Sequence, residues 1–275
     1  MERRVIVDSC VDTNDEIKDL FDTVPLSILI DDEEIIDDNL DQGFLIKKLA
    51  DAKDSIKTAC PSPEKYLEKM KKYKESFVVT LSAKLSGSYN SAVLASNLLL
   101  EKGTDTFTHV FNTKSASAGE TLVALKIKEL MDNSLGREEI IKITNDYIEK
   151  MQTLFVLDSY EVLKKTGRLS NIKAGLLNIL NIAPIMGSTE EGSIRVVKKV
   201  RGKKKALKKL VDVIGDFDVD YPNTVLGISR CNAEDKAFML KEDIEKKYNF
   251  KDIKIFETRG ISTVYASDGG IVLSF

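Results

Sequence analysis

Hydroxyl side chains gather at three points where predicted strands give way to helices. Residues 82–92 read SAKLSGSYNSA and follow the apolar run at 77–81, and residues 58–62 and 113–117 also carry Ser and Thr. The first segment alone holds four serines, more than a tight turn needs. Each junction also presents a helix N-terminus, whose free N–H groups and partial positive charge attract anions. The combination suits a carboxylate or a phosphate.

Ordinary helix capping is the alternative explanation at any single junction. Ser62 stands before Pro63, which favours a helix start, and Ser117 with Glu120 matches a capping box. In an open parallel sheet, however, such junctions meet outside the carboxyl ends of the strands, where ligands bind. The junctions together favour a binding site. They carry neither GxxxxGK[ST] nor GxGxxG, which speaks against a nucleotide site.

Groups suited to catalysis are scarce. His109 is the single histidine, and alternation along its predicted strand places it on the face that carries Phe107 and Phe111. A Ser-His-Asp triad needs a histidine in a loop beside its serine, and no residue near the serines is suited to take their proton. The residues therefore favour holding an anion over cleaving a substrate.

The composition is that of a globular protein. The chain has 275 residues, 43% of them hydrophobic and 31% charged, which is enough for two domains with real cores. A net charge of −3 with both signs interspersed speaks against a general nucleic-acid binder. No apolar run approaches the roughly 18 residues of a membrane span, and the start lacks a signal-peptide stretch, so we expect a cytoplasmic protein. The three cysteines are far apart and form no CxxC pair, so no zinc site or disulfide framework is indicated.

The pattern of elements predicts an α/β fold with two domains and a ligand cleft between them. Strands and helices alternate over residues 1–152, which predicts an N-terminal α/β domain whose sheet is mostly parallel and whose loops carry the hydroxyls. The pattern changes at residues 153–275, which we assign to a second α/β domain. Strands are expected at 4–7, 26–30, 34–36, 77–81, 107–112, 154–157, 193–200, 224–229, 253–258 and 271–275. Helices are expected to begin near 63, 88 and 118 and to span 137–152, 159–166, 203–214 and 233–248.

Two further segments stand out by composition. Residues 175–186 are apolar around most of a helical surface, which predicts either plain core or the wall of a cavity for an apolar ligand. Residues 198–209 hold eight cations. They can dock an acidic partner or contact phosphates, or they form the solvated face of a helix whose inward side is Ala206, Leu207 and Leu210.

Several motifs, taken in order, resemble the DegV family of bacterial proteins along nearly the whole chain. They are TACPSP (58–63), LSGSYNSA (85–92), TKSASAG (113–119), LDSYEVLKKTGRLS (157–170), LLNILNIAPIM (176–186) and KVRGKKKALKKL (199–210). The resemblance implies a long-chain fatty acid buried between two α/β domains. Members of the fatty-acid-kinase type present its carboxyl group to a separate ATP-dependent kinase subunit, which makes acyl phosphate for phospholipid synthesis. The resemblance thus implies a non-catalytic subunit with no cofactor, and it leaves room for transient contact with a membrane surface.

The resemblance also implies a set of ligand-binding residues. Thr58 and Ser86 would contact the carboxyl group, Gly87 and Ser88 would add backbone N–H groups, and Arg168 would lie near the mouth. Ser62 and Ser117 belong to the same hydroxyl-rich junctions. The wall around the tail would be formed by Leu176, Ile179, Leu180, Ile182 and Ile185.

The head-group region departs from the family pattern. In VYASDGG (264–270), Ala266 stands where the family often has a histidine that helps hold the carboxyl group, and Ser267 follows it. Arg230 stands where a second histidine can occur, and we hypothesise that it restores the positive charge. Asp268 would repel a ligand carboxylate unless one of the two is protonated. Cys60 replaces a glutamine beside the pocket.

Two alternatives remain open from the sequence. One is an enzyme acting on a small carboxylated or phosphorylated metabolite, which would need a shallow polar cleft. The other is a regulatory protein that docks through residues 198–209.

Overall fold

The computed structural model describes residues 3–275 except 54, 102, 104 and 173–181. One of its three sheets is fully parallel, with strand order β2-β1-β6-β7. Its strands are β1 (Arg3–Asp8), β2 (Asp22–Val24), β6 (Glu75–Thr80) and β7 (Phe107–Asn112). The predicted α/β fold class with a parallel first sheet is therefore confirmed.

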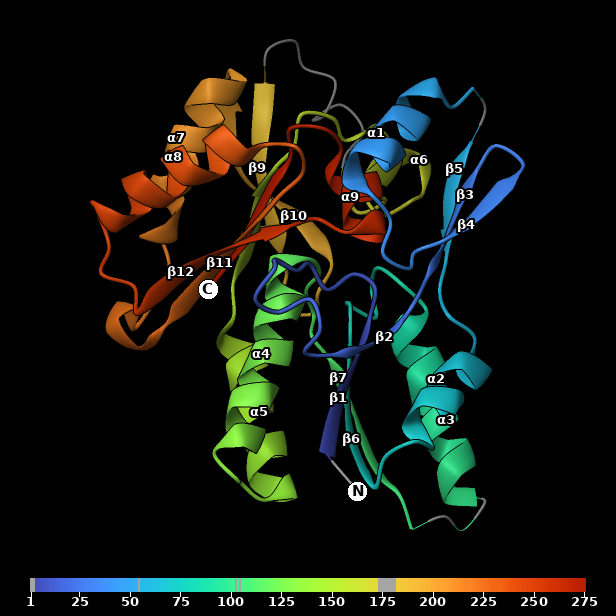
Figure 1. The fold of residues 1–275 in the computed structure, drawn as a ribbon. Coiled ribbons are helices and arrows are strands. Elements are labelled where there is room, and N and C mark those ends of the chain that lie inside the picture. The colour runs from blue at the N-terminus through green and yellow to red at the C-terminus, as the bar shows by residue number, and fades with distance from the viewer. Residues whose placement is uncertain (1–2, 54, 102, 104, 173–181) are drawn as a thin grey trace.

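Helices cover both faces of this sheet (Figure 1). The helices α2 (Pro63–Met70) and α3 (Ser88–Glu101) lie on one side, and α4 (Ala118–Asp132) and α5 (Arg137–Lys150) on the other. The alternation of buried residues explains this layering: Val5 and Phe77 pack with the α4 and α5 side, whereas Ile6 and Val78 pack with the α2 and α3 side.

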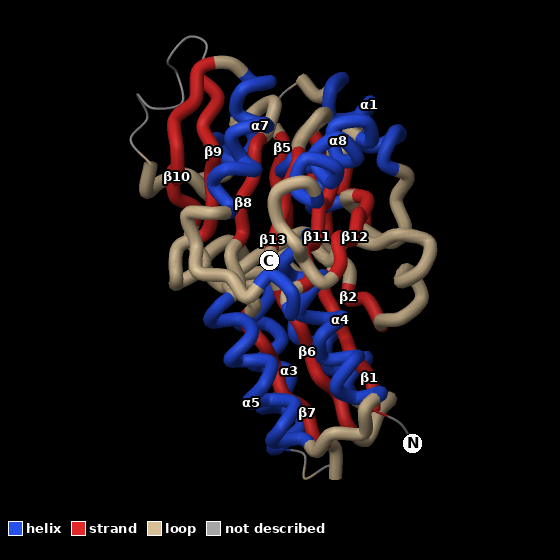
Figure 2. Tube along the Cα trace, turned by 90° about the vertical axis from the view of Figure 1, so that its left-hand side faces the viewer, coloured by secondary structure: helices blue, strands red, loops and turns tan. Residues whose placement is uncertain are grey.

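The second sheet has six strands in the order β10-β9-β8-β13-β11-β12, and only β11 and β12 pair in parallel. Its strands are β8 (Thr153–Val156), β9 (Ile182–Ser188), β10 (Ile194–Arg201), β11 (Val225–Arg230), β12 (Asp252–Glu257) and β13 (Ile271–Ser274). The helices α7 (Lys203–Ile214) and α8 (Glu234–Glu245) cover one face. The helix α4 contacts β11 and β13 as well as β1 and β6, so this single helix packs against both large sheets. Figure 2 shows the two sheets toward opposite ends of the molecule.

A third, antiparallel sheet with the order β4-β3-β5 lies beside the second (Figure 1). It contains β3 (Ser27–Ile30), β4 (Glu33–Ile36) and β5 (Ile56–Ala59). The helix α1 (Gln42–Asp51) lies between β4 and β5 in the chain. Asp41 caps α1 by accepting a hydrogen bond from Phe44 N at 2.6 Å. The helix α1 packs on α9 (Gly260–Ala266), while α6 (Glu161–Lys165) and a short 3₁₀ turn (Tyr221–Asn223) complete the described elements.

The sequence-based elements agree with most of this arrangement, with some corrections. The hairpin of β3 and β4 and the helix at 203–214 are found as predicted. The helical interpretation of 175–186 is wrong for its last part: residues from Ile182 onward form β9, which is buried on both faces and therefore lacks the alternation of a half-exposed strand. Residues 175–181 of that segment lie outside the described part of the chain. The sequence reasoning did not predict β2, α1, β5 or α9.

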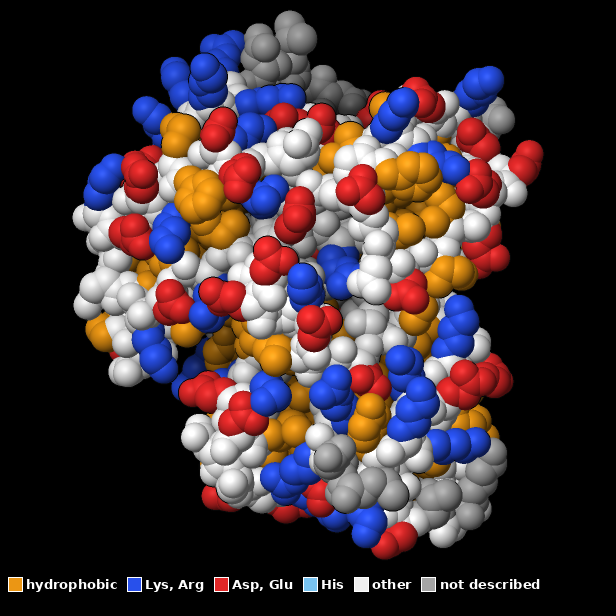
Figure 3. Space-filling model, in the orientation of Figure 1, with side chains coloured by type: hydrophobic (Ala, Val, Ile, Leu, Met, Phe, Trp, Pro, Cys, Tyr) orange, Lys and Arg blue, Asp and Glu red, His pale blue; other side chains and the backbone are white. Residues whose placement is uncertain are grey.

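The surface carries mixed charges. Figure 3 shows cationic side chains gathered over the corner where α7 lies and acidic ones near the hairpin of β3 and β4. Along α7, Ala206 and Leu210 are fully buried while the lysines of its first turn are exposed. The basic run thus includes the solvated face of an amphipathic helix. No helix in the described ranges combines the length and apolar character needed to cross a membrane.

The turn between β9 and β10 of the second sheet packs against the loops that follow β6 and β7 of the first sheet. At its tip Gly192 has φ +87°, and its carbonyl accepts a hydrogen bond from Ser82 Oγ at 2.8 Å. A Cβ atom on Gly192 would lie 2.3 Å from Ser82 Oγ and 2.8 Å from Lys114 Cα. Only glycine fits this contact, because both the backbone conformation and the space exclude a side chain.

We predict that Gly192→Ala lowers the free energy of unfolding by about 2–4 kcal/mol, from left-handed strain and steric overlap together. Gly202→Ala is the matched control: φ is +89°, but no atom lies within 4 Å of its added Cβ. The control carries only the backbone strain of its positive φ, about 1–3 kcal/mol, and should lose less stability than Gly192→Ala. Chemical denaturation measures both, and equal losses would show that the turn is not packed against the first sheet.

Candidate functional site

A cavity lies where the three sheets meet. Its wall is built from β5, from the loops that follow β6 and β7, from the hairpin of β9 and β10, and from β8, α6 and α9. The space open to the centre of a water-sized sphere is about 110 Å³, and the total empty volume of about 880 Å³ includes open solvent at the mouth. Both halves of the chain contribute to it, so the predicted cleft between them has a counterpart in the structure.

The wall is overwhelmingly apolar. Aliphatic and aromatic side chains from both halves of the chain line it, among them Leu26, Leu85, Phe155, Leu163, Ile194 and Val272. These side chains pack on one another in two clusters around α9, which contributes Ile261, Tyr265 and Ala266. Such a surface offers no hydrogen bonds and favours a hydrocarbon ligand over a polar one.

Hydroxyl side chains also line the cavity at several places, and two of them, on Thr58 and Tyr265, bond to each other. Thr58, in β5, faces Tyr265, in α9, and their hydroxyl groups share a hydrogen bond of 2.7 Å. The pairing of β5 with β3 sets the position of Thr58 opposite Ile28. Ser86, from the loop after β6, lines the same cavity. Thr58 and Ser86 were predicted from the sequence, and Tyr265 was not.

Arg168 brings a positive charge to this part of the wall. Its guanidinium group lies 5.7 Å from the centre of the Tyr265 ring, within the range of a cation–π contact. Its Nε donates to Leu85 O at 3.1 Å and its Nη1 to Thr166 O at 2.7 Å. No carboxylate of the described residues forms an ion pair with it, so its charge is directed only to neutral groups.

The loop after β6 points some of its hydroxyl groups away from the cavity. Ser88, the first residue of α3, is fully buried and donates a hydrogen bond from Oγ to Asp8 Oδ2 at 2.6 Å. Gly87 packs against Cys60, whose Sγ would lie 3.0 Å from a Cβ atom there. Ser62 is exposed before α2 and makes no capping hydrogen bond. These three predicted ligand-binding residues do not line the cavity.

The predicted capping box at Ser117 and Glu120 is wrong. Ser117 has φ +59°; its Oγ donates to the Asp12 carboxylate and accepts no capping hydrogen bond from the backbone N–H groups of α4. Glu120 is fully buried and makes no hydrogen bond that would close the box. Ser117 does line the cavity, but its hydroxyl group already donates a hydrogen bond to Asp12.

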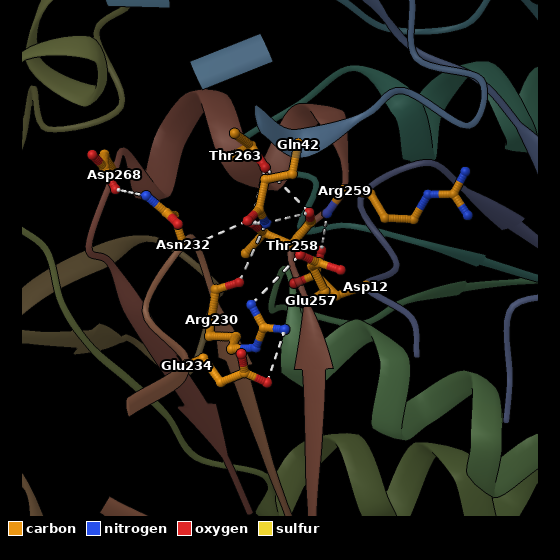
Figure 4. A network of polar contacts seen from close by, with 10 residues as sticks. All are labelled: Asp12, Gln42, Arg230, Asn232, Glu234, Glu257, Thr258, Arg259, Thr263 and Asp268. Atoms are coloured by element: carbon orange, nitrogen blue, oxygen red, sulfur yellow. Dashed lines mark hydrogen bonds and ion pairs between the residues drawn. The ribbon is translucent and has the colours of Figure 1, made fainter. Parts of the chain in front are cut away.

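Arg230 lies outside the cavity wall. Figure 4 shows its guanidinium group directed toward Glu234 and Glu257, with N–O distances of 3.7 and 3.5 Å. Asp268 is exposed and accepts a hydrogen bond from Asn232 at 2.8 Å, so it does not face the cavity either. The suggested replacement of a histidine by Arg230 therefore has no support in this geometry.

The same network fixes α1 to the second sheet. The Gln42 side chain donates to Thr258 O at 2.9 Å and accepts from Asn232 N at 2.9 Å (Figure 4). Because α1 packs on α9, this contact helps to hold the third sheet, and with it Thr58, against the helix that carries Tyr265.

The predicted tail residues have mixed positions. Ala266 lines the cavity, whereas its neighbour Ser267 does not. Ile185 is fully buried in the core beneath α7, and Ile182 is half-buried at the start of β9, so neither reaches the wall. Three further predicted residues lie outside the described part of the chain: Leu176, Ile179 and Leu180.

The groups near the cavity are poorly suited to nucleophilic chemistry. Cys10 lines the wall, but burial and then the nearby carboxyls of Glu120, Asp8 and Asp12 raise the pKa of its thiol well above the usual value. His109 lies on β7, and its ring is edge-on to the Phe111 ring, with the two ring centres 4.6 Å apart. Burial lowers the pKa of His109. No group of three His, Cys, Asp or Glu side chains in the described ranges has the arrangement of a metal site.

A sequence signal for Tyr265 exists in retrospect. Ile261, Ser262, Tyr265 and Ala266 recur at helical spacing, and all four line the cavity. However, α9 has only seven residues and contains several β-branched side chains, so the helical repeat of its apolar residues is hard to recognise in the sequence.

Comparisons with known proteins agree with this architecture. A crystal structure of a DegV-family protein from Ruminococcus gnavus ATCC 29149, refined with vaccenic acid, matches with a TM-score of 0.96 and 44% identity, covering 100% of this chain and 99% of that one. The Streptococcus pneumoniae Fatty Acid Kinase (Fak) B3 protein loaded with linoleic acid matches with a TM-score of 0.92 and 33% identity over the same shares.

Sequence comparison leads to the same group. The DegV domain-containing protein spr0652 of Streptococcus pneumoniae R6 is 33% identical over 280 residues, which cover 100% of this chain and 99% of the relative. The sequence model of the DegV family matches residues 3–275. This chain therefore belongs to the DegV family.

Proposed function

We propose that this chain binds a long-chain fatty acid in the cavity and presents the carboxyl group to a separate ATP-dependent kinase subunit, which converts it to acyl phosphate. The observation that carries the proposal is a mainly apolar cavity whose wall also bears hydroxyl groups and two cationic side chains, Arg168 and Lys114. Two full-length structural relatives, at 44% and 33% identity, support it because their structures hold vaccenic and linoleic acid.

The tail supplies most of the affinity in this proposal. Each buried methylene contributes about 0.8 kcal/mol, so a long acyl chain offers a gross gain on the order of 10 kcal/mol. Hydrogen bonds to a charged group add roughly 1.5–3 kcal/mol each. They mostly offset the cost of removing the carboxylate from water, so the hydroxyl groups orient the head more than they tighten binding.

The head group would lie beside Thr58, Ser86 and Tyr265. Thr58 and Tyr265 already share a hydrogen bond, and a carboxylate oxygen between them would accept from one or both hydroxyl groups. Arg168, stacked near the Tyr265 ring, would add an attractive charge. The part of the wall that bears Leu163, Phe155 and Ile194 would surround the tail.

The kinase subunit would supply the chemistry. The Fak B3 relative is named as part of a fatty acid kinase. What supports a non-catalytic role here is that the buried Cys10 thiol is kept neutral and that His109 lies on β7, away from the cavity wall. An enzyme acting on a small polar metabolite would need a polar cleft, which this wall of aliphatic side chains disfavours.

We predict that Thr58→Ala combined with Ser86→Ala leaves the fold intact and removes most of the fatty acid that co-purifies with the protein. Two lost hydrogen bonds should weaken binding by about 100-fold or more. Mass spectrometry of organic extracts, normalised to protein, measures the bound acid. Ser62→Ala is the control, since Ser62 is exposed outside the cavity. A double variant that retains the wild-type amount would refute this placement of the head group.

Tyr265→Phe keeps the ring that Arg168 contacts and removes only the hydroxyl group. We expect oleic acid to bind about 10- to 100-fold more weakly to this variant, because the carboxylate loses one donor. Methyl oleate has the same tail without the charge, so its affinity should change far less. Titration calorimetry with both ligands separates the cases, and equal losses for the two would mean that the hydroxyl group only supports the wall.

We also expect acyl phosphate to form only when the loaded protein, ATP and a fatty acid kinase subunit are mixed. Hydroxylamine trapping detects the product. Product formed by this chain and ATP alone would overturn the non-catalytic assignment.

A further inference from the structure

Glu120 is a buried acid with a poor supply of hydrogen-bond donors. It lies in the first turn of α4, its side chain is completely buried, and neither of its carboxyl oxygens has a partner within ordinary hydrogen-bond geometry among the described residues. The nearby Cys10 thiol lowers the pKa of Glu120 less than burial raises it. An ionised carboxylate in that position would carry the full cost of desolvation.

The two aspartates beside Glu120 are placed differently. Asp8 accepts three hydrogen bonds, from Cys10 N at 3.0 Å, Leu81 N at 3.0 Å and Ser88 Oγ at 2.6 Å. Asp12 accepts from Ser117 Oγ and from Arg259 N, the latter at 3.0 Å. Burial raises the pKa of all three acids, but these donors act in the opposite direction on Asp8 and Asp12 because they stabilise the ionised form. Of the three acids, Glu120 is therefore the one best suited to keep its proton.

The groups that face Glu120 do not supply a compensating positive charge. Asp8 comes from the end of β1, Cys10 and Asp12 from the turn after it, and Tyr66 from α2. The strands β6, β11 and β13 and the helix α5 also pack against α4, and β11 contributes the neutral Ser229 hydroxyl beside Asp12.

Arg259 reaches Asp12 only through its backbone. Its guanidinium group bonds Asn39 at 2.7 Å and points away from Asp12 (Figure 4). Burial first, and then the charge of Asp8, raise the pKa of Glu120 well above its usual range.

We propose that Glu120 is a neutral carboxylic acid that keeps its proton and donates a hydrogen bond to the Asp8 carboxylate, and so positions the group that holds the turn of Ser86 and Ser88. The chain of contacts is short. Asp8 fixes Ser88 through Oγ, and Ser88 N donates to Ser86 Oγ at 3.2 Å. Ser86 lines the cavity. Glu120 is thus a positioning residue for a head-group contact, and this last step rests on the proposed function.

The unfolding equilibrium tests the protonation state directly. Above about pH 4.5 the unfolded chain releases the Glu120 proton while the folded protein keeps it, so wild type loses stability as the pH rises. Glu120→Gln has the same shape, remains a donor and cannot titrate. The unfolding constant of wild type, divided by that of Glu120→Gln, should rise about tenfold per pH unit from pH about 5 upward.

The matched control is Glu129→Gln on the same helix, where the exposed carboxylate pairs with Lys126. The unfolding constant of wild type, divided by that of Glu129→Gln, should not rise with pH. A wild-type to Glu120→Gln ratio that is constant from pH about 5 to 8, or that falls, would overturn the proposal.

Infrared spectroscopy gives a second measurement that does not depend on stability curves. Wild type at pH 7 should show the carbonyl band of a protonated carboxylic acid, and Glu120→Gln should lack it. Absence of that band from wild type contradicts the proposal, as does a Glu120→Gln variant that does not fold, since a neutral donor of equal shape should be tolerated.

Ligand affinity tests the positioning role. With oleic acid as the probe at pH 7, Glu120→Gln should bind within about twofold of wild type, whereas Glu120→Leu, which has no donor, should bind at least about tenfold more weakly. Equal binding by the Leu variant would remove the positioning role. Failure of wild type to bind oleic acid would refute the proposed function and leave the proton of Glu120 to be judged by the other two measurements.

Discussion

Burial of a hydrocarbon chain requires apolar space that a protein does not fill with its own side chains. Interiors are normally close-packed, and each large sheet here builds such a core with its own helices. The cavity arises where those cores end, because strand ends, the turn at Gly192 and the short helix α9 meet there without interdigitating fully. The helix α4 packs against both sheets and keeps them at a fixed separation.

The polar groups around the cavity orient a ligand more than they add to its affinity. Thr58 and Tyr265 satisfy each other, and Arg168 is held by two carbonyl oxygens, so none of them depends on a ligand for the fold. Behind them, Asp8 and Asp12 organise the loops that follow β1, β6 and β7. Such buried networks rigidify a site when every member is satisfied, which is why the proton on Glu120 matters to the architecture.

Much of the fold follows from local patterns. The helix at 203–214 was predictable because Ala206 and Leu210 recur at helical spacing with lysines between. Thr58 and Ser86 stand in hydroxyl-rich segments that the sequence showed, and the family resemblance singled them out as carboxyl contacts, although the strand β5 that carries Thr58 was not predicted. Tyr265 was not predictable, since α9 is too short to show a clear period, and Ser117 was misassigned because its partner Asp12 lies 105 residues away in sequence. Ile182 was misassigned because a strand buried on both faces has the same apolar run as a buried helix.

The central claim is that the tail, buried in an apolar cavity, supplies the affinity. A calorimetric series of saturated fatty acids that differ by one methylene measures this directly. Each added methylene should lower the dissociation constant about fourfold, the equivalent of about 0.8 kcal/mol, until the cavity is full, with a negative heat-capacity change. A series whose affinities do not depend on chain length would contradict the account.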